Sequence, residues 1–227
     1  MRHLALLLLL LPLSGWAGET VRVAVAANFK HTLAAVSADF ERRSGHKVVL
    51  SSASTGVLYT QILHGAPFDI FFAADAQTPA KLATPSRKPR CYARGSLVLA
   101  GGSEDLRQLA DPSLSLSIAN PGTAPYGRAA VEVLERPEFA TARGRKLVRG
   151  SNVVQAFQFW HSGGVSLALV PRSLAPEAAP IPLAWHQPLE QHVIVLRDKD
   201  AVGAYLNWVI SDSVRSLIND AGYESCP

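Results

Sequence analysis

The sequence lacks the short motifs that carry catalysis in several large enzyme classes. It contains no Gly-x-Ser-x-Gly elbow, no Walker phosphate loop, no Gly-x-Gly-x-x-Gly fingerprint and no His-Glu-x-x-His zinc motif. These absences argue against the common hydrolases, nucleotide enzymes and zinc peptidases. We therefore expect a protein that is not an enzyme and needs no cofactor.

Long apolar runs are also scarce. One lies within residues 1–17, where a basic start at Arg2 and a leucine run end in small residues at Gly15 and Ala17, as in a secretory signal peptide cleaved after Ala17. The run is too short to span a bilayer comfortably, and no cysteine follows it to receive a lipid. We expect a cleaved signal and a soluble periplasmic protein, with an uncleaved anchor as the alternative.

Cysteine occurs only at Cys91 and Cys226. An even count in an oxidising compartment predicts a disulfide between them, which ties the C-terminus to the middle of the chain. The alternative is two separate thiols. A metal site with only these two soft ligands is not expected.

The excess of positive charge is small. The formal net charge of +4 becomes +3 when Arg2 is removed with the signal. The basic segments at residues 87–90 and 142–146 have no interleaved aromatic side chains. We therefore expect no nucleic-acid partner.

The β-branched and alanine-rich run at residues 21–27 organises the rest of the chain. It ends at Asn28, after which apolar residues recur every three or four positions up to Phe40. This pattern predicts a buried strand leading directly into an amphipathic helix with Asn28 as its N-cap. A helix start at the carboxyl end of a sheet presents free backbone N–H groups, which favour an anion.

The same pattern of a strand followed by a helix start recurs along the chain. Ser54 and Thr55 follow a second strand, and Asp75 is expected to cap a helix after a third rather than to act as a general base. Two later helices are predicted to begin near Tyr126 and at Val153. The further predicted strands are residues 47–50, 68–74, 114–119, 146–148, 165–171 and 192–198, followed by a C-terminal helix pair.

These units predict an α/β protein with two lobes, each a mixed, mainly parallel sheet flanked by helices. We expect residues 18–97 and 197–227 to form the first lobe and residues 98–196 to form the second. Ligands of such sheets bind beyond the carboxyl ends of the strands. The four loops near residues 28, 55, 126 and 153 are therefore expected to face one cleft between the lobes.

The four loops supply N–H and hydroxyl donors and little acid. A fully ionised tetrahedral oxyanion only accepts hydrogen bonds, whereas a protonated phosphate needs a carboxylate to accept its proton. The residues therefore favour a sulfate-like or molybdate-like ion over phosphate. Lys30, Arg128 and Arg149 lie near the loops, and we expect their charged groups to point into solvent.

Five segments of the chain are VAVAANF, SSASTG, GAPFDIFFAADAQTP, IANPGTAPYGRAAVEVL and GSNVVQAFQF. In their order and spacing they resemble the periplasmic molybdate-binding proteins of ABC transporters, over nearly the whole mature chain. The resemblance implies a type II periplasmic binding protein, usually monomeric, that closes its lobes on molybdate or tungstate and delivers the ion to an inner-membrane permease. It also implies the residues that donate to the ion, which are Asn28, Ser54, Thr55, Tyr126 and the backbone N–H of Val153.

Two positions depart from the family pattern. Ala27 stands where relatives with an asparagine in the first loop often have threonine, and Pro171 stands where many have a tyrosine that reaches the ion. Each missing donor to a charged ligand costs about 1.5 to 3 kcal/mol of binding free energy. Tyr126 has a hydroxyl that is absent from those relatives with alanine at this position, and we expect it to compensate.

Three alternatives remain open at this point. The same fold can be retuned to another oxyanion or small anionic solute. A secreted serine hydrolase would use a hydroxyl of the loop at residues 51–55 with a distant histidine. A metal-binding or adhesion module would be stabilised by a divalent cation rather than by an anion.

Overall fold

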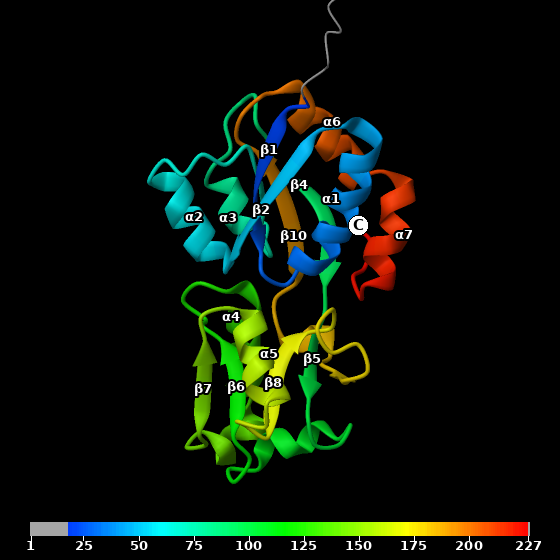
Figure 1. Ribbon diagram of the computed structural model, residues 1–227. Helices are drawn as coiled ribbons and strands as arrows, with labels where there is room; N and C mark the ends of the chain where they lie inside the picture. Colours follow the sequence, from blue (N-terminus) through cyan, green and yellow to red (C-terminus); the bar gives the residue numbers. More distant parts are fainter. Residues whose placement is uncertain (1–17, 227) are drawn as a thin grey trace, which may run out of the picture.

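The computed structural model describes residues 18–226, so the signal peptide predicted at residues 1–17 lies outside the described residues. The chain forms two lobes, each built on a five-stranded sheet, stacked one above the other in Figure 1. Within residues 18–226, no helix is long and apolar enough to cross a membrane.

The sheet of lobe 1 has the strand order β2-β1-β3-β10-β4. β1 pairs in parallel with β2 and β3, whereas β10 runs antiparallel to β3 and β4. The sheet is therefore mixed, with parallel pairs in half of its pairings. The strands are β1 (Thr20–Ala26), β2 (Lys47–Ala53), β3 (Ile70–Phe72), β4 (Arg90–Gly95) and β10 (Leu189–Val195).

Helices cover both faces of this sheet. Figure 1 shows α2 and α3 on one face and α1, α6 and α7 on the other. The alternation of β1 explains this arrangement, because Val23 and Val25 pack in the core beside α1, while Ala24 packs with Leu58 of α2. The helices are α1 (Lys30–Ser44), α2 (Thr55–Leu63), α3 (Gln77–Ala80), α6 (Asp200–Val209) and α7 (Asp212–Asp220).

Lobe 2 repeats the design with the strand order β7-β6-β8-β5-β9. β6 is parallel to β7 and β8, and β5 is antiparallel to β8 and β9. The strands are β5 (Leu97–Ala100), β6 (Leu116–Ala119), β7 (Leu147–Gly150), β8 (Leu167–Pro171) and β9 (Ala179–Pro180). The helices are α4 (Pro125–Leu134) and α5 (Val153–His161), with the 3-10 turns η1 (Leu106–Ala110), η2 (Pro137–Ala142) and η3 (Leu183–Trp185).

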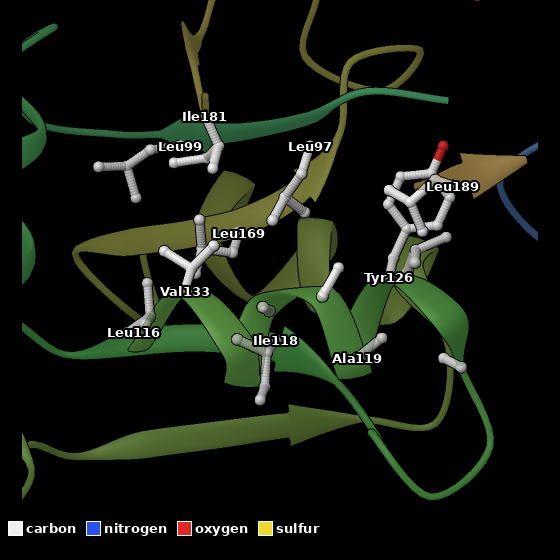
Figure 2. Packing of buried hydrophobic residues seen from close by; sticks show 14 of the residues in the cluster. Leu97, Leu99, Leu116, Ile118, Ala119, Tyr126, Val133, Leu169, Ile181 and Leu189 are labelled. Carbon is white, nitrogen blue, oxygen red and sulfur yellow. The ribbon is translucent and has the colours of Figure 1, made fainter. Parts of the chain in front are cut away.

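Alternation in β5 divides the core of lobe 2 between two faces. Leu97 and Leu99 pack in the cluster that includes Val133 of α4, whereas Val98 and Ala100 pack with Ala156 of α5. Figure 2 shows the first cluster, in which the Tyr126 ring lies beside Leu189 at one end. Leu189 belongs to β10, so this core reaches the junction between the lobes.

The predicted lobe boundaries need correction at the second crossing. β10 begins at Leu189 and pairs with β3 and β4 of lobe 1, so the chain returns to lobe 1 before Leu189 rather than after residue 196. The polar residues Glu190 and Gln191 hide the start of this strand in the sequence. At the first crossing, Leu97 already pairs with Pro171 in lobe 2, so Ser96 is the connection.

The disulfide predicted from the cysteine count is present. Cys91 of β4 is bonded to Cys226, 135 positions later, with 6.0 Å between the Cα atoms. Arg94 and Glu224 also form an antiparallel bridge. The C-terminal segment is thereby held against the strand that leads into lobe 2.

Candidate anion-binding site

Four loops, two from each lobe, meet at one small cavity. Two follow the parallel strands β1 and β2, and two follow the parallel strands β6 and β7. Because parallel strands end at the same edge of a sheet, each lobe contributes a pair of neighbouring loops. All five residues predicted to bind the ion line the cavity, and they are Asn28, Ser54, Thr55, Tyr126 and Val153.

The cavity is narrow. The space open to the centres of water-sized spheres is about 10 Å³, which is roughly what one water molecule requires. With the lobes in this arrangement, the cavity suits a compact ion and excludes solutes the size of a sugar or a peptide.

Three helices begin at the cavity wall. Thr55 is the first residue of α2, Tyr126 is the second residue of α4 after Pro125, and Val153 is the first residue of α5. N–H groups in the first turn of a helix have no acceptor within the helix, and the helix N-terminus carries partial positive charge. The backbone N–H groups of these residues therefore provide donors from both lobes.

Two hydroxyl groups of lobe 1 add donors. The Ser54 side chain is 4% exposed, and its Oγ has no hydrogen-bond partner among the described residues. Thr55 Oγ1 accepts a hydrogen bond from the Ala74 N–H at 3.0 Å, which leaves the hydroxyl proton of Thr55 available. A buried hydroxyl without a partner is costly, so the Ser54 hydroxyl is suited to a ligand that only accepts.

The cavity is lined by uncharged residues. No Asp, Glu, Lys or Arg is among the described residues that line it. Lys30 and Arg149 are exposed, as predicted. Arg128 is only partly free in solvent, because its Nη2 lies 2.6 Å from Asp75 Oδ2. Any anion here is therefore held by neutral dipoles rather than by a direct ion pair.

Asp75 has the structural role predicted for it. Its Oδ1 accepts a hydrogen bond from the Thr78 N–H at 2.9 Å, and its Oδ2 accepts one from the Thr78 hydroxyl at 3.0 Å. These bonds satisfy a first-turn N–H of α3, although the N-cap position itself is held by Ala76. The carboxylate lies outside the residues that line the cavity.

Asn28 does not cap α1, so that prediction is wrong. Phe29 holds the N-cap position, without a side-chain hydrogen bond. The Asn28 carboxamide instead donates to Gln191 Oε1 at 2.8 Å and to the Tyr223 hydroxyl at 3.3 Å. The backbone carbonyl oxygen of Asn28 accepts a hydrogen bond from the Tyr223 hydroxyl at 2.7 Å. These long-range partners outcompete the local cap, and Asn28 lines the cavity with its carboxamide bonded to Gln191 and Tyr223.

The Tyr126 hydroxyl is also bonded away from the ion site. It accepts a hydrogen bond from Gln191 Nε2 at 3.3 Å. Burial raises the pKa of Tyr126 well above 10 and raises the pKa of Tyr223 to about 12. Both hydroxyls therefore remain protonated donors at physiological pH.

The two positions that depart from the family pattern lie in different places. Ala27 lines the cavity, whereas Pro171 ends β8 opposite Leu97 and is outside the described lining.

Sequence reasoning missed Asn152, which lines the cavity and caps α5 through hydrogen bonds from the Val154 and Gln155 N–H groups. An asparagine directly before a predicted helix start was the available signal.

The chain is similar to bacterial solute-binding proteins over most of its length. Residues 21–224 match the family model described as bacterial extracellular solute-binding protein. The chain is 36% identical to the molybdate-binding protein ModA of Azotobacter vinelandii, covering 89% of each chain. It is 33% identical to the molybdate-binding protein ModA of Rhodobacter capsulatus, covering 94% of this chain and 91% of the relative.

Solved structures agree with this relationship. The periplasmic molybdate-binding protein of Azotobacter vinelandii superposes with a TM-score of 0.81 at 31% identity, covering 91% of this chain and all of that chain. The sulfate-binding protein SubI of Mycobacterium tuberculosis superposes with a TM-score of 0.72 at 12% identity, covering 90% of this chain and 86% of that one. At that identity the second likeness shows the fold alone.

Proposed function

Because the chain belongs to the bacterial extracellular solute-binding proteins and, within them, to the molybdate-binding proteins, we propose that it captures molybdate or tungstate. We place it in the periplasm, after removal of the signal peptide. It delivers the ion, without chemical change, to the permease of an ABC importer. It works as a monomer and needs no cofactor.

The unpartnered Ser54 hydroxyl is the observation that carries this proposal. It lies at the N-terminus of α2, in a cavity that three helix N-termini share and that no described charged side chain lines. Such a site provides donors and no carboxylate to accept a ligand proton. It therefore favours a fully ionised tetrahedral oxyanion over a protonated phosphate.

Selection between molybdate and sulfate depends on size. Both ions accept the same hydrogen bonds, so only the separation of the donors distinguishes them. A smaller ion leaves some donors unpaired, and each unpaired buried donor costs about 1 to 3 kcal/mol. The narrow cavity and its lining by both lobes support this kind of discrimination.

Thermal unfolding of the mature protein tests the function. The midpoint is measured alone and with millimolar molybdate, tungstate, sulfate or phosphate. An ion at a thousand times its Kd stabilises the native state by about 4 kcal/mol, which raises the midpoint by several degrees. We expect molybdate and tungstate to raise it and phosphate to leave it unchanged.

The other outcomes identify the alternatives. A shift with sulfate but not molybdate would favour a relative retuned to another oxyanion. A shift with a divalent cation alone would favour a metal-binding module. A serine hydrolase would require an imidazole beside a loop hydroxyl, and Ser54 Oγ has no hydrogen-bond partner in the described chain. Covalent labelling of the protein by a serine-directed phosphonate would favour the serine hydrolase.

A further inference from the structure

A side chain of lobe 2 is inserted into the buried hydrogen-bond network of lobe 1. Tyr126 belongs to α4, and its hydroxyl is bonded to Gln191 of β10. Gln191 is fully buried. Figure 2 shows the Tyr126 hydroxyl at the edge of the lobe 2 core, on the side of Leu189. This contact joins the two lobes through Tyr126, which also lines the ion cavity.

Gln191 is the centre of that network. Its Oε1 accepts a hydrogen bond from Asn28 Nδ2 at 2.8 Å and one from the Tyr92 hydroxyl at 2.9 Å. Its Nε2 donates to Tyr126 at 3.3 Å. One amide therefore connects the first ion-binding loop, the strand β4 and the third ion-binding loop.

A local irregularity gives Gln191 this position. The pairing of β10 with β4 shifts register between Gln191 and His192, as in a β-bulge. Bulges bend a strand and redirect the side chains next to them, and they are frequent beside functional sites. Here the shift occurs at Gln191, whose side chain is hydrogen-bonded to both ion-binding loops.

The position of Tyr126 depends on a glycine. A Cβ atom at Gly95 would lie 1.9 Å from the Tyr126 hydroxyl oxygen, 2.7 Å from Gln191 Nε2 and 2.9 Å from Tyr126 Cζ. Gly95 does not have a positive φ, so backbone strain does not explain a glycine there. The absence of a side chain at residue 95 instead makes room for the tyrosine of the other lobe.

We propose that Gln191 is a positioning residue that couples closure of the lobes to the shape of the ion site. In this view Tyr126 enters the space over Gly95 when the lobes close. Its bond to Gln191 then completes a network that holds the Asn28 carboxamide away from the ion and presents the backbone of Asn28 to it. The inference rests on the proposed function and assigns Asn28 and Tyr126 side-chain roles other than direct donation to the ion.

The bond between Gln191 and Tyr126 makes binding sensitive to how completely the lobes close, because the amide and the hydroxyl both lose water when the lobes meet. A buried amide or hydroxyl without a partner is penalised more than a paired one is rewarded. Incomplete closure, for example around an ion of the wrong size, leaves Gln191 Nε2 and Tyr126 unpaired. Complete closure pairs them. The network therefore favours ions that allow the lobes to meet fully.

A double-mutant cycle tests the coupling. Molybdate affinity is measured by calorimetry for the wild type, Tyr126→Phe, Gln191→Met and the double variant. We expect Tyr126→Phe to bind roughly tenfold more weakly, since it leaves Gln191 Nε2 unpaired, and Gln191→Met to bind at least as weakly, since it also removes the bonds to Asn28 and Tyr92. We expect the double variant to bind no more weakly than Gln191→Met, because both changes remove the same bond.

Tyr205→Phe is the matched control. Tyr205 is a buried tyrosine of lobe 1 whose hydroxyl is bonded to Ser37 at 2.7 Å, away from the cavity. Its substitution should lower the free energy of unfolding and leave molybdate affinity unchanged. Denaturant unfolding of every variant without ion separates loss of stability from loss of binding.

Gly95→Ala supplies a test that keeps all the polar groups. Its methyl group occupies the space of the Tyr126 hydroxyl, so we expect roughly tenfold weaker binding. Adding Tyr126→Phe removes the atom that lies 1.9 Å from the new Cβ. The pair should bind more tightly than Gly95→Ala alone, a rescue that a direct ion contact from Tyr126 does not produce.

The possible results separate the two proposals. If the wild type binds neither molybdate nor tungstate, the proposed function fails and this inference fails with it. If the wild type binds and the effect of Tyr126→Phe persists fully in the Gln191→Met protein, the tyrosine contacts the ion and this inference alone is overturned. Unchanged affinity in Gly95→Ala overturns it as well.

Discussion

Asp75 and Arg128 form an ion pair across the two lobes. Asp75 Oδ2 lies 2.6 Å from Arg128 Nη2, although Asp75 follows β3 of lobe 1 and Arg128 lies on α4 of lobe 2. A second contact joins the lobes on the same side, where the Gly56 N–H donates to the Thr123 carbonyl at 2.8 Å. The lobes are therefore held together by these two contacts as well as by the bond between Tyr126 and Gln191.

Arg128→Gln should weaken ion binding slightly and reduce its dependence on salt. The Arg128 side chain is 43% exposed, so the pair contributes only about 0.2 to 1 kcal/mol. That corresponds to a loss of affinity between about 1.4-fold and fivefold at low salt. Calorimetric titration with molybdate at low and high ionic strength measures both the loss of affinity and its dependence on salt. Arg215→Gln, which removes an exposed pair within α7, is the control and should have no effect on binding.

Ser54→Ala should reduce affinity without reducing stability. A hydrogen bond to a charged ligand contributes about 1.5 to 3 kcal/mol, so binding should weaken roughly tenfold to a hundredfold. The ion-free protein loses only a buried hydroxyl that has no partner in the described chain, so its unfolding free energy should stay constant or rise. Calorimetry and denaturant unfolding measure the two effects. Unchanged affinity would remove Ser54 from the site, and Ser86→Ala in an exposed turn serves as the control.

Removal of the disulfide should lower stability substantially. The bond closes a loop of 135 residues between Cys91 and Cys226. Loss of a native disulfide from a secreted domain typically costs about 2 to 5 kcal/mol. The double substitution Cys91→Ser with Cys226→Ser should lower the Tm accordingly, and a reducing agent should then cause no further change. Equal Tm values for the reduced and oxidised wild type would contradict this prediction.

Stability should depend on pH through His192. Desolvation by burial lowers the pKa of His192 below its usual value near 6.5, with Glu190 opposing the shift. The unfolded chain therefore binds a proton more readily, so the contribution is complete above about pH 6.5 and is lost as the pH falls through the folded-state pKa. The slope for one group is at most about 1.4 kcal/mol per pH unit.

Denaturant unfolding of the wild type and of His192→Gln between pH 7.5 and pH 5 isolates this contribution. The wild type should lose more stability than the variant over that range. His31→Gln, at an exposed position on α1, is the control and should follow the wild type. Parallel curves for the wild type and His192→Gln would show that His192 does not titrate differently on folding.

Local patterns were sufficient to predict most of the elements. The period of the apolar residues located α1, and the serine and asparagine before Thr55 and Val153 marked the starts of α2 and α5. Because parallel strands end at one edge, the same patterns also predicted that the four loops meet. All five predicted donors line a single cavity for this reason.

Predictions that depended on partners distant in sequence were less successful. The sequence around Asn28 predicts a helix cap. In the structure its carboxamide is instead hydrogen-bonded to Gln191 and Tyr223, which lie 163 and 195 positions away in the sequence. The start of β10 was missed because Glu190 and Gln191, directly after Leu189, are polar, and their pairing partners lie on β4. Neither the hydrogen-bond partners of Asn28 nor the pairing partners of β10 can be predicted from the few residues next to them in the sequence.

The sequence by itself determined which residues can donate to an oxyanion, and in which helix starts they lie, because propensity and capping act over a few positions. Only the tertiary structure decided where those donors point. Tyr126 and Asn28 both carry polar side chains at the ion loops, yet both are turned toward Gln191. Burial favours pairing of polar groups, and the partner nearest in space is fixed by how the two lobes meet.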